Sequence, residues 1–127
     1  EELIVPFPLG NGRSAHHLQL ALETVKQLMS KVIKIRRHGG SHLKISGILL
    51  NRCDNLASIE AFMPAAFFKQ LKHFCLPITI PRDSSLTDAR ILGKPAVCCD
   101  VGSPGAAAFI ELARHWIDNR QNDSSAD

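Results

Sequence analysis

Polar residues with side chains suited to ligand binding follow a short apolar strand in this sequence. Residues 76–80 have the alternating apolar spacing of a strand, and Pro81 then stops strand pairing because its nitrogen carries no hydrogen. Arg82 and Asp83 come next, at a predicted corner. Because ligands usually bind at the carboxyl ends of strands in α/β sheets, this corner is the first candidate site. The alternative for Arg82 and Asp83 is a solvated surface corner or a local ion pair.

Asn51 and Arg52 end another apolar run. The carboxamide of Asn51 can donate and accept hydrogen bonds at the same time. Taken by itself, however, an asparagine at this place is more often a turn residue that ends a strand. Arg52 has the charge to be a structural partner of Asp54 or Asp83, so its role stays open at this point.

A block of basic residues is the third feature with chemical consequences. Between Glu23 and Asp54 the sequence has no acidic residue, although seven residues there are basic: Lys26, Lys31, Lys34, Arg36, Arg37, Lys44 and Arg52. Such an imbalance can hold a phosphate backbone, with an affinity that falls steeply as salt rises. The alternative is a solvated helix end, because cations favour helix C-termini. The candidates for DNA contact are Lys34, Arg36, Arg37 and Lys44.

Patterns that would support metal binding or independent catalysis are weak. His38 and His42 have zinc-like spacing, but no cysteine lies near them in sequence and no second ligand pair is present, so we expect no metal site. The sequence has no GxSxG nucleophile elbow and no recognisable acid/base pair of carboxylates, and we predict no catalytic residue. The Gly-Lys pair before Pro95 lacks the Ser or Thr of a phosphate-binding P-loop, and the glycine-containing segment at 10–14 lacks its Lys.

Strands and helices alternate along the chain. Strands are predicted at residues 3–5, 43–50, 77–80 and 96–99. Two longer helices are predicted, one from residue 14 to about residue 33 and one within residues 56–74. A short helix of one or two turns is predicted between a cap at Ser84 or Ser85 and a stop at Gly93. The last predicted helix begins at about Pro104. This order predicts an α/β fold of three layers, in which helices flank a mainly parallel sheet with right-handed crossovers.

Composition limits the class of protein further. The chain has 127 residues, of which 45% are apolar, enough for the core of one domain or of part of one. No apolar stretch approaches the roughly 20 residues that a membrane span needs. The four cysteines form no CxxC pair, so we expect reduced, buried thiols in a cytoplasmic protein without a membrane partner. Residues 120–127 are polar, and we predict a disordered tail there.

Three segments together resemble one known family. They read GILLNRCD at Gly47–Asp54, IPRDSSLTDARILGKP at Ile80–Pro95 and CCDVGSPGAAAFIELARHWI at Cys98–Ile117. In this order and spacing they are similar to the C-terminal half of the ParA/MinD (Soj-like) family of deviant Walker-type P-loop ATPases, and the ParA branch fits best. The resemblance covers about residues 43–119. It implies that residues 1–119 form the C-terminal half of a ParA-like ATPase domain, which is a partial P-loop NTPase-like fold.

The resemblance implies a nucleotide site at the corner described above. Family members hold adenine between a strand that ends like the one before Asn51 and a loop like the one that starts at Pro81. It therefore implies base contacts from Asn51, Pro81, Arg82 and Asp83, with Arg52 beside them: the carboxamide would bond the purine edge and the proline ring would offer a flat apolar surface. The cofactors implied for the full-length parent are ATP and Mg²⁺. Because the family's P-loop lies upstream, we expect a truncated chain that is inactive alone.

The partners implied by the resemblance follow from the ParA branch. Its members act in plasmid or chromosome partitioning or position other cargo. They form ATP-bridged homodimers that bind DNA without sequence preference, and a ParB-like protein stimulates hydrolysis. Chromosomal members often carry a basic residue where Ser84 and Ser85 stand here, so DNA binding would have to depend on the upstream basic block.

Other interpretations compete with this one. The chain can be a non-catalytic interaction module derived from the fold, which offers its helices to a partner. It can also be a relative of the dethiobiotin or cobyrinate synthetases, although the long SLTDARILGKP match argues against that class. The MinD branch fits less well, because it usually ends in a basic amphipathic membrane-binding helix and this C-terminus is polar and acidic. The iron–sulfur carrier branch would need a CxxC pair.

Overall fold

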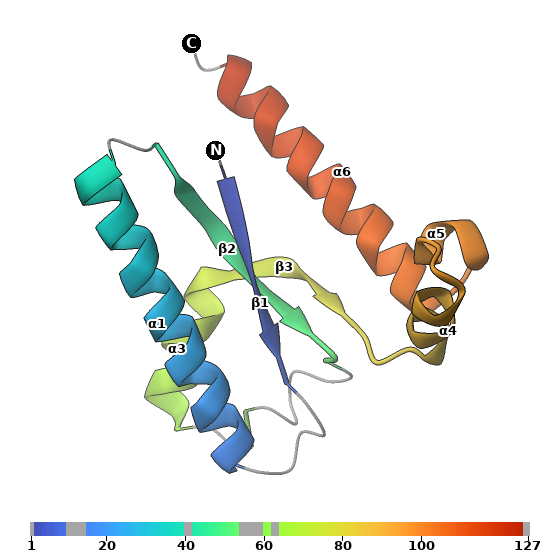
Figure 1. The fold of residues 1–127 in the computed structure, drawn as a ribbon, viewed down its shortest axis with the longest axis horizontal. Helices are drawn as coiled ribbons and strands as arrows, with labels where there is room; N and C mark the ends of the chain where they lie inside the picture. Colours follow the sequence, from blue (N-terminus) through green and yellow to red (C-terminus); the bar gives the residue numbers. More distant parts are fainter. Residues whose placement is uncertain (1, 10–14, 40–41, 54–59, 62–63, 126–127) are drawn as a thin grey trace.

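The computed structural model describes residues 2–9, 15–39, 42–53, 60–61 and 64–125. Its elements, in chain order, are β1 (Glu2–Pro8), α1 (Ala15–Gly39), β2 (Lys44–Asn51), α3 (Ala65–Phe74), β3 (Cys75–Ile80), α4 (Ser84–Leu92), α5 (Ala96–Cys99) and α6 (Pro104–Ser125). The three strands form one sheet in the order β1-β2-β3, and both strand pairs are parallel (Figure 1). The predicted α/β class and parallel sheet are therefore confirmed.

Helices cover both faces of the sheet. One face packs against α1 and α3, and the other packs against α6 with α4 (Figure 1). Along β2, Ile48 and Leu50 belong to the apolar cluster on the α1 side, whereas Leu49 belongs to the cluster under α6. Since successive side chains of a strand point to opposite faces, all three residues are buried. This burial explains the continuous apolar run of the central strand and gives the three predicted layers.

Gly47 lets the central strand pass close to its neighbour. A Cβ at this position would lie 2.7 Å from a terminal carbon of Leu76 and 3.2 Å from the carbonyl oxygen of Phe74. The pairing register of β1 with β2 also shifts beside this glycine, between Leu3 and Ile4. A glycine in a strand commonly marks such a bulge or close approach.

The predicted fourth strand at residues 96–99 is wrong. These residues form the short helix α5, which packs on α4 and α6. Pro95 precedes the helix, and a proline suits a helix start because its fixed φ is already helical. Val97 is 39% exposed, so this apolar run is not buried on both sides as a sheet strand would be. A run of four apolar residues is too short to show the periodicity that distinguishes a helix from a strand in sequence.

Two helices end later than predicted. Helix α1 continues to Gly39, beyond the predicted end near Ile33. Helix α6 continues to Ser125, so residues 120–125 are helical where the sequence predicts a disordered tail. The start of α3 just after Pro64 agrees with the prediction, and the rest of the segment predicted as helix before it lies largely outside the described residues.

The cysteines are free thiols, but only two of them are inside the protein. Cys53 is buried and Cys75 is half-buried, whereas Cys98 and Cys99 are exposed on α5. The expectation of buried thiols is therefore wrong for the adjacent pair, for the same reason that the fourth strand is absent. Burial raises the pKa of the Cys75 thiol to about 11, with a smaller contribution from Cys53, so Cys75 is neutral at physiological pH.

Within the described ranges, none of the helices combines the length and the apolar character that a transmembrane span requires.

Candidate functional site

The carboxyl ends of the three strands meet at one edge of the sheet. Asn51 pairs with Pro8 on one side and with Ile80 on the other, so Asn51 lies next to the residue that precedes Pro81. Two backbone hydrogen bonds hold this edge together. The N–H of Leu9 donates to the carbonyl oxygen of Asn51 at 3.0 Å, and the N–H of Cys53 donates to that of Ile80 at 2.9 Å. The structure thus places Asn51 and the corner after β3 side by side.

Arg52 turns the chain away from the sheet just after Asn51. Its φ of 60° lies in the left-handed region, and it is the one non-glycine residue with positive φ among those described. This conformation costs about 1–2 kcal/mol for a residue with a Cβ. The turn brings Cys53 to the position where its N–H can reach Ile80. Arg52 is exposed and Asn51 is half-buried, so both side chains border solvent.

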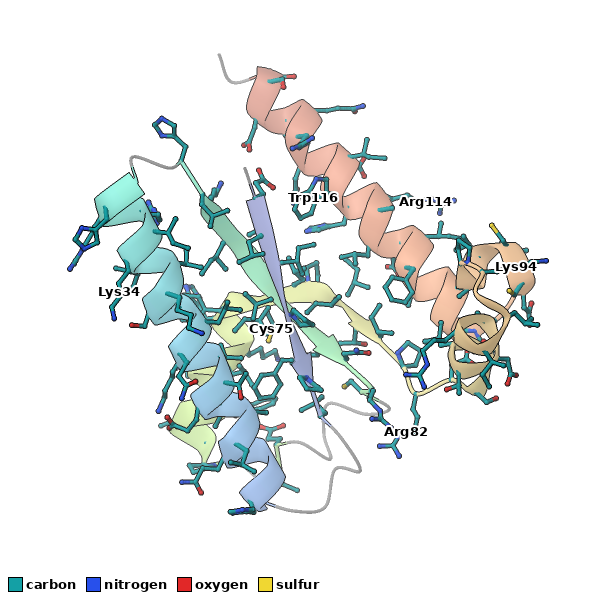
Figure 2. The ribbon with its side chains drawn as sticks, viewed as in Figure 1. Lys34, Cys75, Arg82, Lys94, Arg114 and Trp116 are labelled. Atoms are coloured by element: carbon teal, nitrogen blue, oxygen red, sulfur yellow. The ribbon has the colours of Figure 1, made fainter. Side chains whose placement is uncertain are left out.

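Pro81 and Arg82 form the link from β3 to α4. Pro81 is half-buried, whereas Arg82 is exposed, and Figure 2 shows its side chain extending away from the sheet. The two residues follow directly on Ile80, the partner of Asn51. The corner thus offers one apolar ring and one cation at the edge where Asn51 offers a carboxamide.

Asp83 has a structural role that the sequence did not reveal. One oxygen, Oδ1, accepts from the N–H of Ser85 at 2.9 Å and caps α4, so the predicted caps Ser84 and Ser85 are wrong. The other, Oδ2, accepts from the N–H of Gly105 at 2.7 Å, in the first turn of α6. The bonds from Gly105 and then Ser85 hold the pKa of Asp83 below its ordinary value. Sequence could not show the Gly105 bond because its partners are 22 residues apart.

Gly105 is a residue beside the candidate site that sequence analysis missed. A Cβ there would lie 2.6–2.8 Å from three carbons of Leu86, so the glycine allows α4 and α6 to approach closely. Ser103 is buried, and its Oγ accepts from the N–H of Ala106 at 3.2 Å, as expected of a residue that caps α6. A glycine inside a first helical turn is an unfavourable choice for helix formation, which is the signal that could have indicated this contact.

The predicted DNA residues lie at the opposite end of the sheet from Asn51. Lys34, Arg36 and Arg37 are exposed near the end of α1, and Lys44 is the exposed first residue of β2. Figure 2 shows Lys34 pointing outward from α1. Arg36 lines a cavity on the α1 side of the sheet, whereas Lys44 lines a groove on the α6 side. The structure therefore gathers these cations at one end of the molecule but divides them between two faces.

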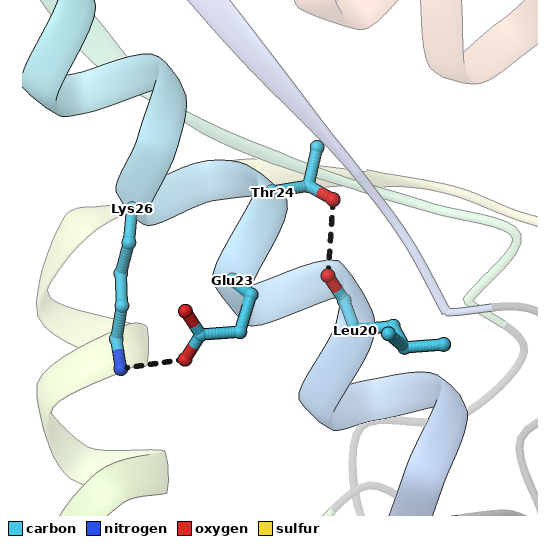
Figure 3. Close-up of polar contacts among 4 residues, drawn as sticks. All are labelled: Leu20, Glu23, Thr24 and Lys26. Atoms are coloured by element: carbon cyan, nitrogen blue, oxygen red, sulfur yellow. Dashed lines mark hydrogen bonds and ion pairs between the residues drawn. The ribbon is translucent and has the colours of Figure 1, made fainter.

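Two other members of the basic block are separated from this group. Lys26 forms an ion pair with Glu23 at 3.2 Å, so its charge is compensated locally (Figure 3). In the same figure, the Thr24 hydroxyl donates to the carbonyl oxygen of Leu20 at 3.0 Å, within the helix. Arg52 lies at the carboxyl end of β2, on the far edge of the sheet. The block that is continuous in sequence is therefore not one surface.

Comparison with known proteins identifies the family. The chain is 30% identical to the sporulation initiation inhibitor protein Soj of Bacillus subtilis over 99 residues, which cover 78% of this chain and 39% of Soj. It is 28% identical over 106 residues to the chromosome partitioning protein ParA of Caulobacter vibrioides, covering 84% of this chain and 39% of that protein. This chain is a ParA/Soj-like sequence. ParA of Myxococcus xanthus agrees, with 28% identity over 97 residues that cover 76% of the chain and 34% of the relative.

The ParA/Soj-like chain spans well under half of the length of each of these relatives. No family model matches it. The resemblance that the sequence showed is thus confirmed at the level of the family. The roles of individual residues at the edge of the sheet stay predictions.

Proposed function

We propose that this chain is part of a ParA-like ATPase that acts in chromosome or plasmid partitioning, and that it supplies the adenine side of the nucleotide site. The observation that carries the proposal is the register of β2 with β3, in which Asn51 pairs with Ile80 and so lies beside the Pro81 corner. The relatives named above, two of which are chromosome partitioning proteins, support the same role.

The chemistry at this edge suits a purine. The half-buried carboxamide of Asn51 can donate to and accept from the purine edge, and the part-exposed ring of Pro81 offers an apolar surface to a base. Arg82 is an exposed cation at the same corner. Strained backbone is often found at ligand sites, and the left-handed Arg52 next to Asn51 agrees with that.

Asp83 acts in this proposal through the loop and not through the base. Both of its oxygens accept backbone hydrogen bonds, from Ser85 and Gly105, so the carboxylate fixes the corner against α4 and α6. The loop that carries Pro81 and Arg82 is thereby held between β3 and the helices. A pre-positioned loop binds a ligand at a lower entropic cost than a loop that must first become ordered.

The remaining parts of the proposed ATPase are not residues of this sequence. ATP would be bound with Mg²⁺ in the full-length protein, where a P-loop would hold the triphosphate and the metal ion. The nucleotide would join two copies in a homodimer that binds DNA without sequence preference, and a ParB-like protein would stimulate hydrolysis. The chain's own contribution is recognition of the base.

The test separates binding of the base from binding of the phosphates. In the full-length protein, Asn51→Ala should weaken ATP binding about tenfold, because the loss of one or two hydrogen bonds costs about 1–1.5 kcal/mol. Binding of inorganic tripolyphosphate, which has no base, should not change. Titration calorimetry with both ligands measures the two affinities.

Asn122→Ala is the matched control, because Asn122 is exposed near the end of α6 and away from the proposed site. Unchanged ATP affinity in Asn51→Ala would contradict the role of Asn51. A full-length protein that binds neither ATP nor tripolyphosphate would instead favour the interaction module.

A further inference from the structure

The cavity lined by Arg36 lies on the α1 side of the sheet, apart from the strand ends that carry Asn51. Its volume is about 420 Å³, within the range of about 300–1,000 Å³ that small-molecule sites occupy. It lies between α1, the sheet and the junction of α3 with β3. Most of its lining is apolar and includes Val25, Met29, Val32, Ile45, Ile48 and Phe74.

The ionisable groups of this cavity favour an anion. Among the described residues that line it, Arg36 and His73 are basic and none is acidic. Within the described part of the chain, the guanidinium of Arg36 has neither an ion-pair partner nor a hydrogen-bond partner. His73 makes an edge-to-face ring contact with Phe74, at a centroid distance of 5.3 Å. The thiol of Cys75, which also lines the cavity, is neutral.

We propose that this cavity binds a small amphiphilic carboxylate, with its alkyl chain among the apolar side chains and its carboxylate on the guanidinium of Arg36. A guanidinium matches a carboxylate through two parallel hydrogen bonds. The apolar walls provide the second half of the recognition, because each methylene that leaves water strengthens binding about fourfold. A neutral lipid would leave Arg36 without a partner, and inorganic phosphate would leave the apolar walls exposed to water.

The mouth of the cavity is already open to solvent in the structure. Ile33 and Phe74 line it and are 46% and 56% exposed. An apolar ligand that covers these side chains would remove them from water. The inference does not depend on the proposed ATPase role, because the cavity shares no residue with the edge that carries Asn51.

The first experiment compares decanoate with decanol on the full chain by titration calorimetry. The two probes share an alkyl chain of one length and differ in charge. Decanoate should bind about tenfold tighter than decanol, as a charge-assisted hydrogen bond predicts. Arg36→Gln should remove this difference, whereas Arg37→Gln should keep it, because Arg37 is an exposed neighbour that does not line the cavity. Equal affinity of the two probes for the unmodified chain would overturn the proposal.

The second experiment blocks the cavity from its mouth. Ile33→Trp should weaken both decanoate and decanol at least tenfold, because the larger side chain fills the space of the ligand. Ile35→Trp is the matched control, since Ile35 is 50% exposed and lies outside the cavity lining. Both substituted positions are at the surface, and circular dichroism melts show whether each variant folds. Undiminished decanoate binding by folded Ile33→Trp would overturn the site.

The source of the carboxylate is tested with a chain-length series and with vesicles. Affinity should rise from hexanoate to decanoate and then level off, because a cavity of fixed volume holds a limited chain. Sedimentation with phosphatidylglycerol vesicles tests a membrane as the alternative source of an anionic amphiphile. Binding to these vesicles without any binding of free decanoate would overturn the proposal and assign the surface to a membrane.

Discussion

At the scale of single residues, the carboxylate of Asp83 determines how the corner after β3 is held. It is the N-cap of α4 through Ser85 and the partner of the Gly105 N–H at the start of α6. Both helix starts carry partial positive charge, which favours an ionised carboxylate at this point. The candidate residues Pro81 and Arg82 lie directly before this anchor. The positions of Pro81 and Arg82 therefore depend on the hydrogen bonds of Asp83, the residue that follows them.

Asp83→Asn should lower the melting temperature by about 4 °C at pH 7, because it removes the charge and one of the two acceptors. The pKa of Asp83 is depressed in the folded state, so its contribution is complete above the pKa of the unfolded chain and is lost as pH falls through the folded pKa. The melting temperatures of the variant and the parent should therefore converge as the solution is acidified. Thermal melts between pH 3 and pH 7 measure this.

Asp88→Asn is the control for this prediction, since Asp88 is exposed on the same helix. A difference between Asp83→Asn and the parent that stays constant from pH 7 to pH 3 would contradict the assigned role. It would indicate that the charge of Asp83 does not stabilise the fold.

At the scale of elements, the contact between α4 and α6 fixes the geometry of the corner. Leu86 of α4 packs against the backbone of α6 at Gly105, where a side chain would leave no room. Ala106 and Ala108 are buried on the same stretch of α6, so small residues let the helix lie close to its neighbours. The close packing also keeps the Gly105 N–H within 2.7 Å of Asp83.

Gly105→Ala should destabilise the protein by about 1–3 kcal/mol, as other overpacking substitutions do. Helix preference works in the opposite direction, because alanine favours a helix more than glycine does by about 1 kcal/mol. A Gly105→Ala variant that is more stable than the parent would therefore mean that Leu86 moves aside easily. In a Leu86→Ala background the same substitution should cost little, because the clashing carbons are gone. Urea unfolding of the two single variants and the double variant measures this coupling.

Gly102→Ala serves as the comparison for this prediction, because its Cβ would meet only an oxygen of Asp100, at 3.5 Å. Equal effects of Gly102→Ala and Gly105→Ala on unfolding would contradict the close approach of the two helices.

The short helix α5 illustrates the limit of sequence analysis at this scale. Residues 96–99 are apolar and partly β-branched, which is typical of a strand. The strand predicted at 77–80 is confirmed as part of β3, which pairs with β2, whereas residues 96–99 follow α4 and pack on α4 and α6. The strand propensity of a four-residue segment therefore does not decide its secondary structure, which depends on the elements that pack against it.

At the scale of the whole molecule, charge is distributed unevenly. The net charge is +3, and the predicted DNA residues Lys34, Arg36, Arg37 and Lys44 all lie at the end of the sheet opposite Asn51. A surface at this end can contact a phosphate backbone while the other edge is occupied by a nucleotide. Nucleotide binding and DNA binding therefore do not use the same residues, whereas DNA and the ligand of the α1-side cavity would share Arg36.

Replacing Arg36 and Arg37 together by Ala should weaken the binding of duplex DNA by the full-length protein. The slope of log affinity against log salt should fall in magnitude by about 1–2, because each lost phosphate contact contributes about 0.9. Fluorescence anisotropy at several salt concentrations measures both quantities. Lys94 and Arg114, which Figure 2 shows on the α4–α6 side, replaced together by Ala provide a charge-matched control. Unchanged affinity in the Arg36 and Arg37 variant would assign these residues to a solvated helix end.

The sequence by itself determined the parallel α/β class, the positions of three strands and the family. Those inferences depend on local patterns: apolar runs such as 43–50, proline and glycine at element ends, and motifs continuous in sequence. The resemblance to the ParA/MinD family also implied that Asn51 and Pro81 belong to one site.

Only the tertiary structure decided which residues meet across the chain. It joined Asp83 to Gly105, made a helix of residues 96–99, divided the basic block between the two ends of the sheet, and enclosed the cavity beside Arg36. Each of these outcomes depends on contacts between residues far apart in sequence, and the packing of whole elements brings such residues together.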